Sequence, residues 1–67
     1  MLKVNKERVI QIQSEMGLTN EGMAKKLGLT KVSYCGIKSM DSRNFTLKHI
    51  LICQEMTGES IANFFKQ

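Results

Sequence analysis

Hydrophobic residues recur with helical spacing along most of this chain, and the pattern predicts five helices joined by short loops. In the first helix Val9, Ile12 and Met16 occupy positions i, i+3 and i+7, the inward stripe of an amphipathic helix. Asn5 is a favourable N-cap for this helix, and Gly17 ends it. No segment shows the alternation of a strand, so the expected fold class is all-α.

Residues 19–37 (TNEGMAKKLGLTKVSYCGI) predict two short helices separated by a tight turn. Thr19 and Thr30 stand where they can cap the two helices, and Gly28 stands where the first must stop with a positive φ. The apolar residues on the facing sides are Met23, Ala24, Leu27, Tyr34 and Ile37. This spacing lets the helices cross over one small core as a helix-turn-helix, which can lay its second helix in the major groove of DNA.

The last third of the chain predicts two more helices after a loop. Residues 39–45 lack periodicity and are expected to form the loop, and the fourth helix begins near Thr46. Its expected inward residues are Leu47, Ile50, Leu51 and Met56. Thr57 and Gly58 interrupt the chain before a short fifth helix.

Two adjacent phenylalanines stand in the fifth predicted helix. Because Phe64 and Phe65 follow one another, one helix cannot bury both on the same face of a monomer core. We expect one of them, with Ile61, to seal the core and the other to contact a second copy of the chain. Ile61, Phe64 and Phe65 are therefore the candidate dimer interface.

The chain has 67 residues and is expected to form a single domain over residues 1–67. A domain of this size buries about 60% of its unfolded surface, so dimerisation would be a natural supplement to its stability. The length leaves no room for a substrate cleft with a supporting scaffold, and the sequence carries no nucleophile–base pair or carboxylate pair. An enzyme is therefore not expected.

Positive charge is concentrated in and after the predicted helix-turn-helix. Residues 25–48 contain six basic side chains and one acid, whereas the whole chain has a net charge of +4. The remainder is therefore slightly acidic. Such a segment is the electrostatic footprint expected for phosphate binding, although lysines also line ordinary solvated helix faces.

The cysteines and the single histidine give no metal site. Cys35 and Cys53 form no CxxC pair, and His49 alone cannot complete a ligand set at known spacing. We expect two free thiols in a reducing cytoplasm, with no metal and no cofactor. No signal peptide or transmembrane run is present, since the longest apolar stretch covers only residues 50–53.

Motifs over nearly the whole chain follow a characteristic order: GLT at 17–19, MA at 23–24, LGL at 27–29, Thr30, Ile37 and Leu-x-x-Ile-Leu at 47–51. In this order they resemble the lambda-repressor/Cro-like helix-turn-helix (XRE) family of phage and bacterial transcription regulators. Three positions depart from the family pattern: Tyr34 replaces a usual Val or Ile, Gly36 lies inside the third helix, and Asn20 replaces a common glutamine. The resemblance implies a five-helix, usually dimeric domain that binds a two-fold DNA operator and controls transcription.

The outward residues of the third helix and its neighbours are the candidate DNA contacts. The expected base contacts are Lys31, Val32, Ser33, Cys35 and Gly36. The expected phosphate contacts are Asn20, Lys38, Ser39, Arg43 and Asn44. Among these, Lys31 can donate to guanine O6 and N7, and Val32 can pack on a thymine methyl.

The expected function is that of a sequence-specific DNA-binding regulator, with repression as the expected role and activation left open. Its expected partners are double-stranded DNA and a second copy of the chain, with no membrane and no small-molecule ligand. The alternative is a helix-turn-helix protein-interaction module of the antitoxin or partner-regulator type. The third helix favours this alternative in one respect, because it lacks Arg, Gln and Asn, the usual base-reading residues.

Overall fold

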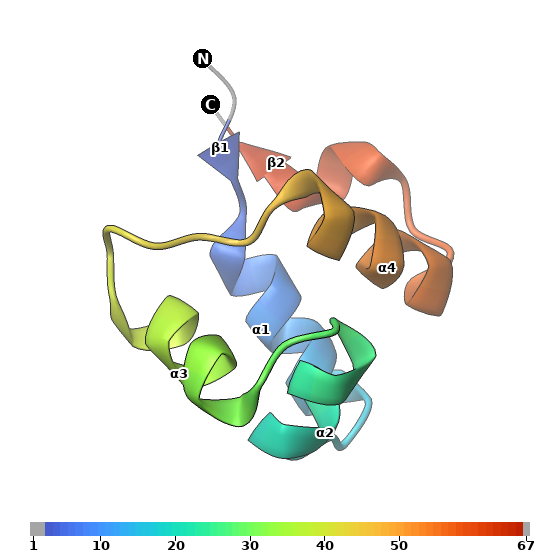
Figure 1. Cartoon of the computed structure of the whole chain (residues 1–67). Coiled ribbons are helices and arrows are strands. Elements are labelled where there is room, and N and C mark those ends of the chain that lie inside the picture. Colours follow the sequence, from blue (N-terminus) through green and yellow to red (C-terminus); the bar gives the residue numbers. More distant parts are fainter. Residues whose placement is uncertain (1–2, 67) are drawn as a thin grey trace.

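The structure is a computed structural model that describes residues 3–66, with four α-helices, one 3-10 turn and two short strands in that range (Figure 1). The helices are α1 (Lys6–Glu15), α2 (Asn20–Lys26), α3 (Lys31–Ser39) and α4 (Leu47–Thr57), followed by the 3-10 turn η1 (Ile61–Phe64). The strands are β1 (Lys3–Val4) and β2 (Phe65–Lys66). This small, mostly helical fold agrees with the predicted all-α class, whereas the predicted count of five α-helices is wrong.

The two ends of the described chain pair with each other, which the sequence pattern did not predict. β1 and β2 are antiparallel, and the paired residues are Lys3 with Lys66 and Val4 with Phe65. The Asn5 N–H also donates to the Phe64 carbonyl at 2.7 Å. A helix through residues 61–66 would forfeit these hydrogen bonds, so the chain makes one 3-10 turn and then extends. α1 does begin after Asn5, but the Asn5 side chain makes no capping hydrogen bond.

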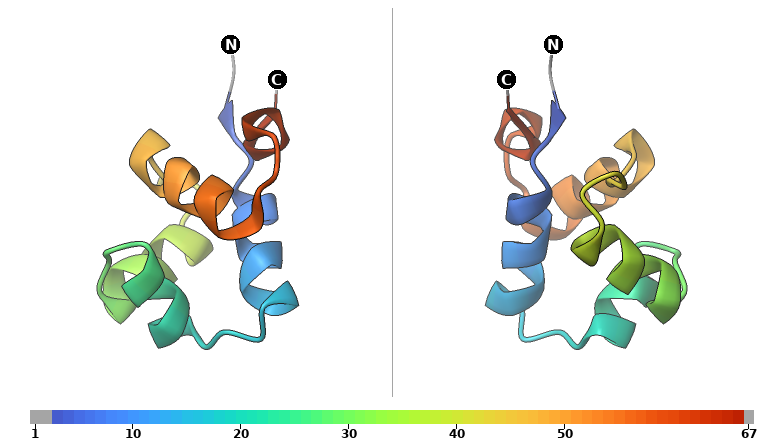
Figure 2. Two further views of the ribbon diagram at one scale, coloured as in Figure 1. Left: turned by 90° about the vertical axis from the view of Figure 1, so that its right-hand side faces the viewer. Right: turned by 90° about the vertical axis from the view of Figure 1, so that its left-hand side faces the viewer.

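The core draws residues from all four helices, from the α3–α4 loop and from η1. Its buried hydrophobic residues are Val9, Ile12, Met23, Ala24, Leu27, Tyr34, Ile37, Phe45, Ile50, Cys53 and Phe64. Figure 2 shows α2 and α3 at one end of the molecule and β1 and β2 at the other, with α1 extending between them. The α2–α3 pair is therefore presented away from the terminal strands.

Three residues predicted to point inward are exposed instead. In α4 the buried stripe runs through His49, Ile50 and Cys53, so Leu47 and Leu51 lie on the opposite side with exposed fractions of 56% and 47%. The apolar residues at 50–53 are consecutive, and their order alone does not determine which ones face the core. Met16 is also exposed, because α1 ends at Glu15 and Met16 is its C-cap.

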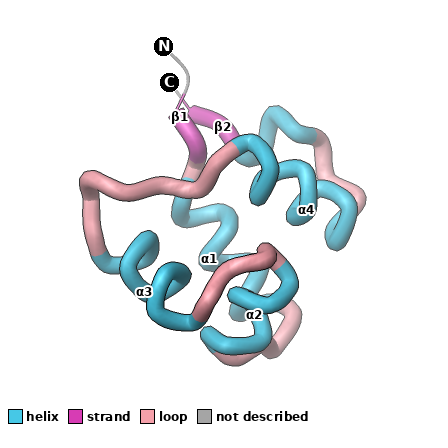
Figure 3. Tube along the Cα trace, viewed as in Figure 1, coloured by secondary structure: helices cyan, strands magenta, loops and turns pink. Residues whose placement is uncertain are grey.

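Residues 40–46 form an extended loop from α3 to α4 that passes close to β1 (Figure 3). Asn44 holds this loop to the strand, since its Nδ2 donates to the Val4 carbonyl at 3.2 Å. Phe45 inserts into the core and anchors the other end of the loop. Within residues 3–66 no helix combines the length and the apolar character needed to cross a membrane.

Candidate nucleic-acid interface

The turn between α2 and α3 is formed by local backbone hydrogen bonds. Gly28 has a φ of 73°, a conformation that glycine adopts without a steric penalty. The Leu29 N–H then donates to the Ala24 carbonyl at 2.8 Å, which closes the end of α2. Ala24 is only 1% exposed, so its methyl group is enclosed where the helices pack. A larger side chain at this position would push them apart.

Both predicted threonine caps are present. The Thr19 hydroxyl oxygen accepts the Gly22 N–H at 3.0 Å, and the Thr30 hydroxyl oxygen accepts the Ser33 N–H at 3.1 Å. Each cap satisfies one N–H group that the helix itself cannot pair. The start of α3 is therefore fixed by residues within a few positions in the sequence.

α3 has one buried face and one exposed face. Tyr34 and Ile37 are buried, as predicted, while Lys31 and Val32 point outward and Val32 is 82% exposed. Ser33, Cys35 and Gly36 are half-buried at the sides of the helix. Of the expected base contacts, Lys31 and Val32 are thus the two that project freely.

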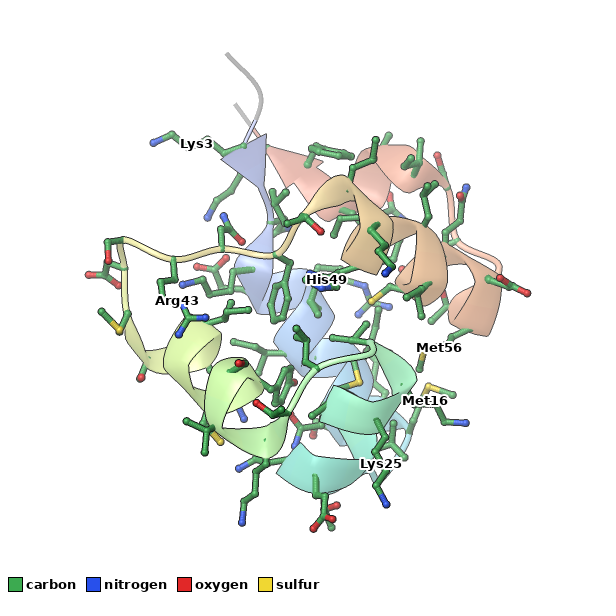
Figure 4. All side chains as sticks on the ribbon, viewed as in Figure 1. Lys3, Met16, Lys25, Arg43, His49 and Met56 are labelled. Carbon is green, nitrogen blue, oxygen red and sulfur yellow. The ribbon has the colours of Figure 1, made fainter. Side chains whose placement is uncertain are left out.

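Gly36 leaves space beside α3 that the guanidinium of Arg43 occupies. A Cβ atom at position 36 would collide with the Arg43 side chain, which folds back over the glycine from the α3–α4 loop (Figure 4). Gly36 is one of the expected base contacts. In the structure the open space above it is occupied by Arg43, which brings a cation onto the flank of α3.

A hydrogen-bond network joins α1 to the start of α2 and to the end of α3. Gln13 is its centre: its Oε1 accepts from the Tyr34 hydroxyl at 2.5 Å and from Lys38 Nζ at 3.2 Å. Gln13 Nε2 donates to the Leu18 carbonyl at 3.1 Å and to Asn20 Oδ1 at 3.0 Å. Lys38 Nζ donates to the same Asn20 oxygen at 2.9 Å. The network orients two of the expected phosphate contacts.

The ammonium group of Lys38 contacts only neutral groups within this network. Its ammonium lies 5.3 Å from the centre of the Tyr34 ring and donates to amide oxygens, so no carboxylate in the network cancels it. Burial raises the pKa of Tyr34 to about 12, so the phenol remains a hydrogen-bond donor at neutral pH. Because Asn20 uses its oxygen within the network, its amide nitrogen is the end left for a phosphate.

Gln13 was not among the residues predicted from the sequence, although its position carries one signal. Position 13 lies four residues after Val9 and directly after Ile12, so it borders the inward stripe of α1. A polar side chain at such a position needs buried partners, which here come from α2 and α3. The partners themselves were not evident from the sequence, because they belong to other helices.

Ser39 and Asn44, both expected phosphate contacts, make hydrogen bonds with the backbone of their own chain. The Ser39 hydroxyl donates to the Cys35 carbonyl at 3.0 Å. Asn44 donates to β1, and its Oδ1 accepts the Phe45 N–H at 2.7 Å. Asn44 therefore shapes the loop. Arg43 is exposed and projects from the same loop.

The expected dimer interface needs one correction. Phe64 is completely buried, so it is the phenylalanine that seals the core and it has no surface to offer a second chain. Phe65 is half-buried beside the core. Ile61, expected to help seal the core, is 37% exposed because η1 turns it outward. Ile61 and Phe65 are the members of this set that stay accessible.

His49 and the cysteines have structural surroundings. His49 Nδ1 accepts the Thr46 N–H at 3.1 Å and so completes a cap at the start of α4. Cys35 and Cys53 are both free thiols, and burial raises the pKa of Cys53 to about 11. In the described part of the chain no three His, Cys, Asp or Glu side chains gather as a metal-binding group.

No family model matches this chain, and searches of curated proteins and of solved structures found no match either.

Proposed function

We propose that this protein is a sequence-specific DNA-binding regulator that places α3 in the major groove. The observation that carries the proposal is the form of α3: it is capped by Thr30, packed through Tyr34 and Ile37, and free on its opposite face. This face carries Lys31 and no acid, and Lys38 lies at its flank. It belongs to a helix pair joined by a tight glycine turn, the arrangement that many DNA-binding proteins use for groove recognition.

The base contacts belong to the first turn of α3. Lys31 donates to guanine O6 and N7, and Val32 packs on a thymine methyl group. N-terminal residues of a recognition helix are the ones that reach base edges in such complexes. Ser33 and Cys35, at the sides of the helix, contact the neighbouring base edges or sugars.

The phosphate contacts flank the helix on both sides. Lys38 and the amide nitrogen of Asn20 form one group, held in place by Gln13. Arg43, seated over Gly36, forms another. These groups fix the register of α3 on the duplex, and they make binding sensitive to salt.

The protein acts as a dimer on a two-fold operator and represses transcription by occupying it, in the manner of the lambda-repressor/Cro-like family. Two recognition helices in such a dimer lie about 34 Å apart, one turn of DNA. Ile61 and Phe65 supply the apolar contacts between the copies. A dimer also supplements the small core of a domain of this length.

Selection from a randomised duplex library at physiological salt tests the proposal. A dimeric regulator enriches a two-fold symmetric site with half-sites about ten base pairs apart. Enrichment of a single half-site supports sequence-specific DNA binding and contradicts the proposed dimer. A folded, helical protein that enriches no sequence contradicts the proposal.

The second candidate function is that of a protein-interaction module. It is favoured by the apolar surface of α4, where Leu47 and Leu51 stand four residues apart and half exposed. Val32 on α3 is a further exposed apolar residue. Binding to DNA that depends little on salt and not on sequence distinguishes this function from the first.

A further inference from the structure

A cavity of about 420 Å³ lies where the two-stranded sheet, the start of α1 and the α3–α4 loop meet. Its charged lining residues are Lys3, Lys6, Glu7, Lys38, Asp41 and Lys66. Four ammonium groups therefore stand against two carboxylates. The set comes from both ends of the chain and from its middle, and it gathers only because β1 pairs with β2.

Two of these four ammonium groups are bound to neutral oxygen atoms. Lys6 Nζ donates to a backbone carbonyl at 2.9 Å, and Lys38 Nζ donates to two side-chain amide oxygens. Within residues 3–66, neither of them nor Lys3 has a carboxylate partner within 4.0 Å. Only Lys66 is paired, with Glu7 at 3.2 Å. The cavity thus borders three positive charges that have no direct ion-pair partner among residues 3–66.

Two of the lysines are held side by side by the sheet. Lys3 and Lys66 are directly opposite each other in the antiparallel pair, and Val4 and Phe65 pack against the core. Side chains at paired positions share one face of a sheet, and like charges there are destabilising. An anion between the two ammonium groups would relieve this repulsion.

We infer that this cavity binds a phosphate group. Lysine ammonium groups carry rotatable donors that suit phosphate oxygens, and they remain charged at neutral pH. Lys38 lines the cavity and also belongs to the network at the base of α3, so the cavity adjoins the proposed DNA-binding face. The phosphate is therefore supplied by the backbone of DNA bound along α3, a source that rests on the proposed function, or by a phosphorylated small molecule.

Titration with inorganic phosphate, against sodium chloride at matched ionic strength, tests the site without DNA. We expect saturable shifts in the amide NMR signals of residues that line the cavity. Lys3→Gln removes one charge near the anion and is expected to weaken phosphate binding by about fivefold, the effect of a charge at about 4 Å in water. Its thermal midpoint is expected to stay equal or rise, since the like-charge pair is gone. Asp41→Asn is expected to strengthen binding.

Lys25→Gln is the matched control. Lys25 lies on α2, at the other end of the molecule from Lys3, and its substitution removes the same charge (Figure 4). It is expected to leave phosphate binding unchanged. Equal weakening in the two variants would mean that phosphate responds only to net charge, which overturns the site.

The salt dependence of binding to a selected duplex separates the two sources. For a DNA phosphate, the double variant Lys3→Gln/Lys66→Gln lowers the slope of log affinity against log salt by about 0.9, the value of one phosphate contact. An unchanged slope with saturable phosphate binding supports the site and overturns the DNA source. An unchanged slope without phosphate binding overturns the site itself. If the parent protein binds no DNA, the proposed function fails, and the phosphate titration still decides the cavity.

Discussion

Lys31 is the single residue on which the proposed base readout by α3 depends most directly. It is exposed, it follows the Thr30 cap, and its side chain has no partner to lose within the described chain. We predict that Lys31→Ala lowers affinity for the selected site by about 1–3 kcal/mol and relaxes the base preference at one position. Competition binding with the selected and scrambled duplexes measures both effects.

Lys25→Ala controls for charge in the same assay, and circular dichroism checks that the helices are retained. The control is expected to change affinity for both duplexes alike, because Lys25 is not among the proposed base contacts and its charge alone carries no sequence information. Unchanged affinity and unchanged base preference in Lys31→Ala would contradict the proposed placement of α3 in the major groove.

His49 makes the stability of the fold depend on pH. Its Nδ1 must be unprotonated to accept the Thr46 N–H, and burial, with Lys48 nearby, lowers its pKa below the ordinary value of 6.5. The unfolded chain therefore takes up the proton first as the pH falls. We predict that the free energy of unfolding is highest above about pH 6.5 and declines below it, by at most about 1.4 kcal/mol per pH unit.

Urea unfolding between about pH 5 and 7.5 measures this decline above the pH range in which a carboxylate such as Glu15 titrates, since Arg8 holds the pKa of Glu15 below its ordinary value of 4.5. His49→Gln keeps a side chain that can cap the helix and removes the titrating group. It is expected to abolish the pH dependence over this range. A decline that persists in His49→Gln would assign it to another group.

At the scale of elements, Gln13 determines how α3 docks on α1. Gln13→Ala leaves the buried Tyr34 hydroxyl without its acceptor, and we predict a loss of about 1–3 kcal/mol in the free energy of unfolding. Tyr34→Phe removes the hydroxyl as well, so the double variant is expected to lose less than the two single variants together. A double-mutant cycle by urea unfolding measures this coupling, and strict additivity would contradict it.

The α2–α3 unit was largely predictable because its determinants are local. The Thr19 and Thr30 caps and the Gly28 turn each act over a few residues, and all three were recognised from the sequence. The position of α4 was not predictable in the same way. Leu47 and Leu51 look as apolar as Ile50, and packing against α1 and η1 decides which of them is buried.

The candidate site was predictable only where it lies on a single helix. The exposed positions of Lys31 and Val32 follow from the inward positions of Tyr34 and Ile37 by helical geometry. The partners of Lys38 come from α1 and α2, and periodicity within α3 contains no information about them. The same holds for the Arg43 side chain over Gly36, since the fold of the intervening loop brings them together.

At the scale of the whole molecule, the C-terminal segment contains a core residue whose substitution is expected to affect folding and a surface residue whose substitution is expected to affect dimerisation. Phe64→Ala removes a fully buried ring, and we predict a loss of about 3–5 kcal/mol, enough to unfold much of a domain this small. Ile61→Ser changes an exposed residue and is expected to weaken dimerisation while lowering the unfolding midpoint much less than Phe64→Ala does.

Sedimentation and thermal unfolding of the two variants test this separation. Phe64→Ala is expected to unfold at a clearly lower temperature than the parent. Ile61→Ser is expected to shift the sedimentation coefficient toward that of the monomer. If Ile61→Ser sediments as the parent does, Ile61 is not part of the interface.

The pairing of β1 with β2 has a consequence for chain connectivity. Because Lys3 and Lys66 are neighbours in the sheet, a short flexible linker can join these two residues, and the chain can be opened instead in the exposed α3–α4 loop near Ser42. Such a circular permutant keeps the hydrogen bonds of the sheet and no longer has to close a loop spanning nearly the whole chain. Its closure entropy, which grows with the logarithm of loop length, becomes that of the linker alone.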